Sequence, residues 1–317
     1  MGLRGRDTKF PFFSVLMDFD DLKRLKHRIA EMLNIRDDDM LRIGFVILTW
    51  NSEKVIDNCL RSISELKMVE PYVFVVDNGS TDRTADIIRQ YEKKTPQRFK
   101  IMQNRTNLGT TVPRNMGIKR LMTIRPDYIC VLDSDTIVND EAFIKLDAEL
   151  KKHPGYGIIG PSLSTSDGVL QMSARCFPTL LVKIYKALPV KSLQKRGELM
   201  EVQRPPYPGV VSYSVDYLMS ACWLVRPEVF KKAGLLDEKI FYAPEDAEYC
   251  IRVWKAGYQV AFCPEAGIIH EWQRISKKKL ISRMNWEHIK GLAYMFYRHH
   301  YLFRSDRMKK SFKKRDK

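Results

Sequence analysis

Tyr128-Ile129-Cys130-Val131-Leu132-Asp133-Ser134-Asp135 is the stretch on which the interpretation of the whole chain rests. Its first five residues form an apolar run with the length and composition of a buried β-strand. In open α/β sheets, ligands collect at the carboxyl ends of the strands, so Asp133 and Asp135 are expected where a ligand arrives. Two carboxylates in this position suit Mg²⁺ or Mn²⁺ shared with substrate phosphates. The alternative is a solvated turn that caps a helix beginning at Asp140.

The residues around this stretch alternate between strand-like and helix-like patterns. Apolar strand patterns occur at residues 43–48, 72–76, 99–102 and 128–132, with helical patterns between them at 55–63, 82–91 and 113–124. Such alternation implies right-handed crossovers between parallel strands. The sequence therefore predicts an α/β fold with a doubly wound, mostly parallel sheet.

The pattern changes after residue 161. Residues 180–208 are rich in Pro, Lys and Arg without a clear period, which predicts a mobile loop or lid. Regular patterns return at 213–225, in helices from Pro227 and over 245–256, and in short strands at 259–263 and 267–270. An amphipathic helix is expected over 280–303, followed by a basic tail at 307–317.

We expect three segments along the chain. Residues 1–40 carry apolar side chains at helical spacing between Leu22 and Leu33, which is typical of an N-terminal helical extension that docks on a domain. Residues 41–275 would form the α/β domain. Residues 276–317 would form a C-terminal amphipathic helix and its basic tail.

Composition limits the class of protein and its partners. The 317 residues are 44% hydrophobic, enough for one large domain with extensions or for two smaller domains. Lys and Arg number 54 against 38 Asp and Glu, and the net charge of +16 predicts anionic partners such as phosphorylated ligands or acidic lipid headgroups. Nucleic acid is not expected, because the basic residues are spread through the chain and no nucleic-acid-binding motif occurs.

Cysteine usage and hydropathy indicate the compartment. The six cysteines lack paired spacing and most lie in apolar stretches, which favours a reducing environment. No uncharged apolar run reaches the length of about 18 residues that a membrane-spanning helix needs. The short apolar stretch 10–17 is followed by Asp18 rather than by a small-residue cleavage site. A cytoplasmic protein is expected, either soluble or peripheral on the cytoplasmic membrane face.

Further polar residues follow other strands of the predicted sheet. Asp77 ends the second strand, where it would accept a hydrogen bond from a base or a ribose hydroxyl; a simple strand-end turn at residues 78–79 is equally compatible. Ser80 is expected to cap the next helix. Residues 49–52 follow the first strand and face the same crevice. Arg114, near a helix start, would face a phosphate or lie on the surface.

A second acidic motif, Glu245-Asp246-Ala247-Glu248, follows the loop Phe241-Tyr242-Ala243-Pro244. It predicts a loop that delivers a carboxylate to a pocket, with Asp246 as a general base. Because acids also favour helix N-termini electrostatically, a purely structural helix start is the alternative. His270, at the end of a short apolar strand, is either a metal ligand or a satisfied core histidine.

Taken in order, these motifs resemble those of family 2 glycosyltransferases with the GT-A fold. The resemblance covers residues 42 to 272 and rests on residues 46–51, 75–82, 114–117, 132–135 and 245–246, with Arg252 and Gly257. Within the family, residues 167–179 and Cys263-Pro264-Glu265-Ala266 before His270 look like the bacterial and archaeal rhamnosyltransferase-like branch.

The resemblance implies a Rossmann-like nucleotide-binding half and a reaction class. The reaction is an inverting, Mn²⁺- or Mg²⁺-dependent transfer of a sugar from a nucleotide-diphosphate donor, dTDP-rhamnose or a UDP-sugar. The acceptor is a hydroxyl of a saccharide or a lipid-linked saccharide in cell-surface glycan synthesis. Because the Gln-x-x-Arg-Trp motif of processive synthases is missing, single addition is expected. The alternative is a protein that binds nucleotide sugars without transferring them.

The resemblance also assigns roles on the donor side. The residues expected to bind the nucleotide diphosphate are Thr49, Asn51, Asp77, Arg114, Asp133 and Ser134. The expected metal ligands are Asp133, Asp135 and His270.

On the acceptor side, Asp246 would deprotonate the acceptor hydroxyl. Glu245, Glu248 and Trp223 are expected beside it. The basic tail, residues 309–317, would aid recruitment to anionic membranes or would simply be a solubilising tail.

Overall fold

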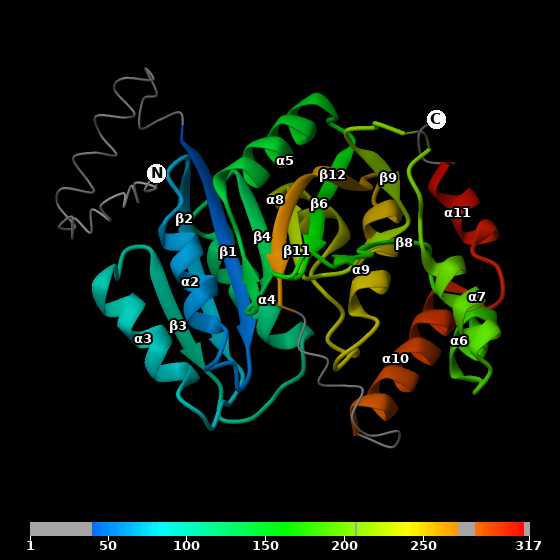
Figure 1. Ribbon diagram of the computed structural model, residues 1–317, viewed down its shortest axis with the longest axis horizontal. Helices are drawn as coiled ribbons and strands as arrows, with labels where there is room; N and C mark the ends of the chain where they lie inside the picture. Colours follow the sequence, from blue (N-terminus) through cyan, green and yellow to red (C-terminus); the bar gives the residue numbers. More distant parts are fainter. Residues whose placement is uncertain (1–39, 207, 272–282, 314–317) are drawn as a thin grey trace, which may run out of the picture. The chain divides into compact units, whose positions relative to one another are not determined.

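Parallel strands and crossover helices build the N-terminal half of the domain (Figure 1). The computed structural model describes residues 40–206, 208–271 and 283–313. Four parallel strands lie in the order β3-β2-β1-β4: β1 (Leu41–Thr49), β2 (Val69–Asp77), β3 (Phe99–Gln103) and β4 (Tyr128–Asp133). They are connected through α2 (Ile56–Ser64), α3 (Thr84–Lys94) and α4 (Thr111–Met122). The predicted alternation of strands and helices is confirmed.

An antiparallel strand joins this half to the rest of the sheet. β11 (Cys222–Val225) lies between β4 and β6 (Tyr156–Ser164) and is antiparallel to both. β12 (Gln259–His270) is parallel to β6 and antiparallel to β5 (Thr136–Ile137) and β9 (Tyr213–Val215). The remaining short strands are β7 (Leu170–Gln171), β8 (Ala174–Arg175) and β10 (Tyr217–Leu218). The helices of this half are α5 (Asp140–Lys152), α6 (Leu180–Ala187), α7 (Lys191–Glu201), α8 (Pro227–Ala233), α9 (Glu245–Lys255), α10 (Arg283–His299) and α11 (Asp306–Lys313).

Apolar side chains cover both faces of the sheet. Successive residues of a strand point to opposite faces, so Phe45 packs in the core with α2, α3 and α5, whereas Val46 packs in the core with α4, α8, α9 and α10. The Phe45 ring meets that of Phe143 of α5 edge to face, with centroids 5.3 Å apart. Burial on both faces explains why the central strands are continuous apolar runs.

Residues 180–208 form two helices where the sequence predicts a loop. α6 and α7 occupy 180–187 and 191–201, and residue 207 lies outside the described residues. Both helices are fastened by Glu201, whose side chain is 2% exposed and accepts from Arg175, Lys183 and Lys186 at 3.1, 2.7 and 2.5 Å. These ion pairs join residues 15 to 26 positions apart, so no local pattern in the sequence indicates them.

Two local predictions are corrected as well. Ser80 does not cap α3: its hydroxyl donates to Asp77, and Asp82 Oδ1 accepts from the backbone N–H of Thr84 at 3.0 Å. The two short strands at 259–263 and 267–270 are one strand, β12, with a register shift between Cys263 and Gly267.

The basic tail is also more structured than expected. Its described part lies in α11, where Lys309 Nζ pairs with Asp216 Oδ2 at 2.6 Å. The Phe312 ring stacks on Trp254 of α9, with centroids 5.7 Å apart. α11 is thus held to the domain by both charge and aromatic contact.

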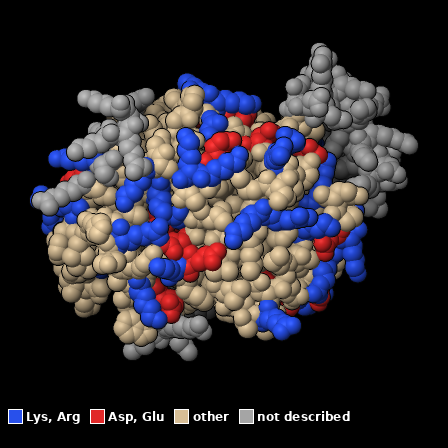
Figure 2. Space-filling model, turned by 180° about the vertical axis from the view of Figure 1, so that it is seen from behind, with Lys and Arg blue, Asp and Glu red and all other residues tan. Residues whose placement is uncertain are grey.

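The chain divides into two compact units, Met1–Met40 and Leu41–Lys317. The expected N-terminal helix lies outside the described residues. Within the described ranges, no helix combines the length and the hydropathy needed to cross a membrane. All six cysteines are unpaired. On the face drawn in Figure 2, Lys and Arg are interspersed with Asp and Glu rather than gathered in one stripe.

Candidate active site

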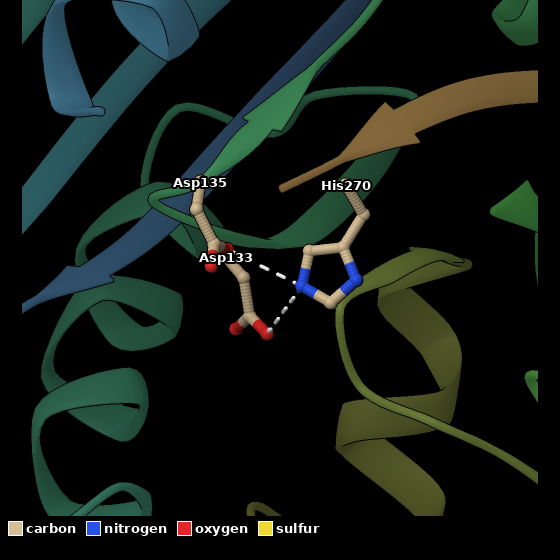
Figure 3. Close-up of side chains that lie close together, drawn as sticks. All are labelled: Asp133, Asp135 and His270. Atoms are coloured by element: carbon tan, nitrogen blue, oxygen red, sulfur yellow. Dashed lines mark ion pairs between the residues drawn. The ribbon is translucent and has the colours of Figure 1, made fainter. Parts of the chain in front are cut away.

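Two carboxylates and an imidazole converge at the carboxyl edge of the sheet. Asp133 ends β4, Asp135 follows in the turn before β5, and His270 ends β12. His270 Nε2 lies 3.3 Å from Asp135 Oδ1 and 3.9 Å from Asp133 Oδ2, and Figure 3 shows the three side chains pointing toward one another. One oxygen or nitrogen of each residue lies within 4.8 Å of the others. The structure thus brings together the three residues that the sequence assigned to a metal.

Strand register places the histidine there. β12 pairs with β5 so that His270 lies opposite Thr136, and the backbone N–H of Glu271 donates to the Asp135 carbonyl at 2.8 Å. The imidazole is therefore carried to the Asp133–Asp135 turn by backbone pairing. His270 is nearly fully buried, so its orientation is fixed by its neighbours.

Gln171 of β7 fixes the tautomer of His270. Gln171 Nε2 donates to the His270 carbonyl at 2.7 Å, which sets the orientation of the amide group. Gln171 Oε1 then lies 2.7 Å from His270 Nδ1 and can only accept, so Nδ1 carries the proton. In the neutral imidazole Nε2 is therefore the nitrogen left to bind a metal, and in the protonated imidazole it donates to Asp135. Metal-binding histidines are commonly oriented by such an outer partner.

Burial and neighbouring charges shift the pKa values of Asp133 and His270. Burial raises the pKa of Asp133, Arg114 opposes that effect, and the charge of Asp135 adds to it. Burial alone lowers the pKa of His270, but the hydrogen bond and charge of Asp135 and the charge of Asp133 outweigh burial and raise it. Two neighbouring carboxylates stabilise a positive charge that lies between them. A site for a divalent cation requires such an environment.

Arg114 of α4 links this cluster to the second acidic motif. Its side chain is buried, with Nη2 2.7 Å from Asp133 Oδ1 and Nη1 3.0 Å from Glu245 Oε1 and 2.9 Å from Ser220 Oγ. Both ends of the guanidinium are therefore occupied by protein carboxylates. The alternative of a surface arginine is wrong, because Arg114 is buried between the two acidic motifs and binds both; its contact with a phosphate stays a prediction.

The segment 241–244, which leads to Asp246, is held from two sides. At the start of α4, Thr110 N–H donates to the Phe241 carbonyl at 2.7 Å, and the Thr110 hydroxyl donates to the Tyr242 carbonyl at 2.8 Å. Gly109 makes this approach possible, because a Cβ at that position would lie 2.1 Å from the Phe241 carbonyl oxygen. From the other side, a Cβ on Gly291 of α10 would lie 2.3 Å from the Ala243 carbonyl oxygen.

Glu245 and Asp246 open helix α9, where Glu245 is buried and Asp246 is partly exposed. Burial raises the pKa of Asp246, while its own backbone hydrogen bond to Ala247 N–H and the nearby cations of Arg175, Lys183 and Arg114 lower it. Burial and the charge of Asp246 raise the pKa of Glu245 to about 8 against the opposing effect of Arg114. Two adjacent carboxyl groups with elevated pKa values suit proton transfer.

The carboxyl ends of β1 and β2 lie side by side, where the sequence predicts contact with a nucleoside. Thr49 and Asp77 face each other in the strand register and are fully or nearly fully buried. Among the described residues, Thr49 Oγ1 and Asp77 Oδ2 have no hydrogen-bond partner. Exposed Asn51 joins the two strand-end loops, since its Oδ1 accepts from Thr81 N–H at 2.8 Å. Ser134 donates from Oγ to Ser52 Oγ at 3.2 Å.

Two residues expected on the acceptor side lie in the core instead. Trp223 of β11 is 0% exposed, stacks on Tyr249 of α9 and donates from Nε1 to the Leu218 carbonyl at 3.3 Å. Glu248 is also 0% exposed and binds Arg252 Nη2 at 2.9 Å and His299 Nε2 at 3.1 Å. Neither side chain reaches solvent. Trp223 fills the interface between the sheet and α9, and Glu248 joins α10 to α9.

Comparison with known proteins agrees with this geometry. The family model described as Glycosyl transferase family 2 matches residues 45–234. N-acetylglucosaminyl-diphospho-decaprenol L-rhamnosyltransferase of Mycobacterium tuberculosis is 24% identical over 271 residues, 80% of this chain and 84% of that protein. Poly-beta-1,6-N-acetyl-D-glucosamine synthase of Staphylococcus epidermidis is 29% identical over 130 residues, 40% of this chain. The chain matches only 30% of that synthase.

Solved structures show the same fold. GalNAc-T7 with UDP, GalNAc and Mn²⁺ superposes with a TM-score of 0.63 at 16% identity, covering 82% of this chain and 49% of that one. The mannosyltransferase PcManGT of Pyrobaculum calidifontis, in complex with GDP-Man and Mn²⁺, gives 0.54 at 14% identity, covering 87% and 70%. Together with the family match, they show that the chain has the GT-A fold and belongs to glycosyl transferase family 2.

Proposed function

We propose that this glycosyltransferase performs an inverting, metal-dependent transfer of a sugar from a nucleotide-diphosphate donor to a hydroxyl of a lipid-linked saccharide. The observation that carries the proposal is the Asp133–Asp135–His270 cluster, joined through Arg114 to the helix start that presents Asp246. One buried guanidinium, that of Arg114, therefore joins the proposed donor site to the helix start that carries the candidate base.

The cluster fits a divalent cation. Two carboxylate oxygens and an imidazole nitrogen lie within 4.8 Å of one another, and the nitrogen is oriented by Gln171. Mg²⁺ prefers oxygen ligands, so the imidazole favours Mn²⁺. When bound, the cation neutralises charge that develops on the departing diphosphate.

The other residues supply binding and proton transfer. Asp77 and Thr49 offer buried, unpartnered oxygens to a base N–H or a ribose hydroxyl. Asp246 accepts the proton of the acceptor hydroxyl, and its raised pKa makes it a stronger base than an exposed aspartate. Arg114 neutralises Asp133 and Glu245, so the elements that carry the two acidic motifs stay together.

The donor and the acceptor are proposed from the relatives. The mycobacterial relative is named as an L-rhamnosyltransferase that acts on a diphospho-decaprenol-linked sugar, which supports dTDP-rhamnose and a lipid-linked acceptor of the cell envelope. TarS of S. aureus has been solved with UDP-GlcNAc, with a TM-score of 0.53, so a UDP-sugar is the second candidate donor.

Thermal stabilisation by nucleoside diphosphates tests the donor site. UDP, dTDP, GDP and CDP are compared with and without Mn²⁺ on the wild type, Asp135→Ala and the control Asp86→Ala, an exposed acid on α3. A ligand that binds only the native state raises its melting temperature. We expect a Mn²⁺-dependent shift with dTDP or UDP that Asp135→Ala loses and Asp86→Ala keeps. The donor site is refuted if no nucleotide gives a shift.

Asp246→Asn separates transfer from binding. The variant should keep the nucleotide shift and lose transfer and donor hydrolysis by about a hundredfold or more, because amides do not accept the proton. Full activity in this variant contradicts the role of Asp246. Binding without any turnover in the wild type indicates a nucleotide-sugar-binding protein instead.

Peripheral membrane contact is a further part of the proposal. It is supported by the net charge of +16 and by the basic C-terminal residues, among which Lys314, Arg315 and Lys317 lie outside the described part of the chain. Replacing these three by Ala leaves α11 in place. Sedimentation with phosphatidylglycerol vesicles should fall in the variant, and unchanged sedimentation rejects the contact.

A further inference from the structure

An apolar groove lies between α6 and α10, two helices that lie side by side in Figure 1. Its volume is about 780 Å³, within the range of small-molecule sites. The apolar lining includes Leu180, Ile184, Ile289, Leu292, Phe296 and Leu302. The side chain of Ile289 is 53% exposed and that of Tyr297 is 78% exposed, so much of this surface meets water. Apolar exposure of this extent commonly marks a binding site.

The groove adjoins the acidic motif of the proposed active site. α10 forms one wall through Ile289, Leu292 and Phe296, and its opposite face packs on the segment before Asp246, where a Cβ on Gly291 would lie 2.3 Å from the Ala243 carbonyl oxygen. Lys183, on the other wall, is one of the cations that act on Asp246. The groove and the segment that leads to Asp246 therefore share α10, and Lys183 belongs both to the groove lining and to the surroundings of Asp246.

Positive charge gathers where the groove approaches that motif. Arg175, Lys183 and Lys186 surround the single carboxylate of Glu201. Three cations around one carboxylate leave an excess of positive charge, which suits an anionic group of a ligand. Apolar walls, a cationic end and a candidate base thus follow one another in space.

We propose that the groove binds the apolar chain of an acceptor whose sugar is joined to that chain through phosphate, with the phosphate facing Lys183 and its neighbouring cations. The proposal rests on the proposed function and assigns the acceptor its binding residues. A saccharide has no apolar chain to bury in the groove, whereas each methylene of a lipid chain that enters it removes apolar surface from water. The three parts of such an acceptor match the order of apolar, cationic and acidic surfaces.

Photocrosslinking with a diazirine derivative of farnesyl phosphate tests the groove directly on the full chain. We expect adducts on peptides from α6 and α10. Farnesyl phosphate should compete, and farnesol should compete about tenfold less, because it lacks the charge-assisted contacts of the phosphate. Adducts confined to other regions, or equal competition by both compounds, overturn the proposal.

A pair of α10 variants supplies the control. Ala293→Trp fills the groove, whereas Lys290→Trp adds the same bulk at an exposed position outside its lining. Labelling should fall about tenfold in Ala293→Trp and stay unchanged in Lys290→Trp. Equal labelling of both variants overturns the proposal. Loss of phosphatidylglycerol vesicle binding in Ala293→Trp, with labelling retained, assigns the face to the bilayer and overturns it too.

The change in melting temperature caused by nucleoside diphosphates distinguishes the two proposals. A Mn²⁺-dependent nucleotide shift without specific labelling rejects the groove and leaves glycosyl transfer standing. Specific labelling without any nucleotide shift rejects the proposed function, and the acceptor assignment falls with it.

Discussion

Neutralising Glu201 should destabilise the domain in a pH-dependent way. Its side chain is 2% exposed and bound to Arg175, Lys183 and Lys186. Burial raises the pKa of this carboxyl, but the charges and hydrogen bonds of Lys183 and Lys186 outweigh burial and lower it from 4.5 to about 2. At about 1.4 kcal/mol per pKa unit, the ionised carboxylate contributes about 3 kcal/mol at neutral pH.

The sign follows from the direction of the shift. Because the folded-state pKa is depressed, the contribution is present above the unfolded pKa of 4.5 and is lost as the pH falls toward about 2. Glu201→Gln should therefore lower the free energy of unfolding by about 3 kcal/mol at pH 7, and the difference from the wild type should shrink below about pH 4.

Urea denaturation between pH 7 and about pH 3 measures this difference. Limited proteolysis within 180–206 checks whether α6 and α7 open first. Glu198→Gln, which neutralises an exposed acid on the same helix, is the matched control and should change little. The reasoning is refuted if Glu201→Gln costs less than about 1 kcal/mol at pH 7, or if the cost does not change with pH.

Three further predictions concern the site. Gly109→Ala should destabilise the domain more than Gly168→Ala. Both glycines have φ of +83°, but only at position 109 would a Cβ meet backbone atoms. Equal urea midpoints for the two variants would contradict the clash. Gln171→Leu should weaken Mn²⁺ binding about tenfold, measured from the Mn²⁺ dependence of the melting temperature; unchanged affinity rejects its orienting role. Arg114→Lys, which keeps the charge but not the fork, should cost about 2 kcal/mol in urea unfolding, and a stability equal to wild type argues against the bridge.

The parts of the fold that depend on local pattern were predictable. The strand that ends at Asp133 is buried on both faces, so its apolar run is continuous in the sequence. The position of Asp133 at the ligand-binding edge of the sheet follows from the parallel topology. His270 is different, because its place beside Asp135 comes from the pairing of β12 with β5, which no local pattern encodes. The family resemblance supplied that residue where physical reasoning left two alternatives.

The errors share a cause, which is that burial and pairing are not local properties. Trp223 lies in an apolar stretch that could face a pocket or the core, and only the packing of α9 decides for the core. Arg114 could have been a surface residue, but two carboxylates distant in sequence enclose it. Glu201 organises α6 and α7 through cations that hydropathy cannot detect.

The position of Arg114 has a thermodynamic consequence for substrate binding. Its guanidinium divides its hydrogen bonds between Asp133, in the proposed donor site, and Glu245, beside the proposed base Asp246. A ligand that changes the charge around Asp133 therefore also changes the surroundings of the Glu245 carboxyl, whose pKa is raised by burial and by Asp246 and lowered by Arg114. Such coupling is reciprocal: whatever factor the metal-bound donor applies to acceptor affinity, the acceptor applies to donor affinity. We therefore expect each substrate to change the affinity for the other through this one buried side chain.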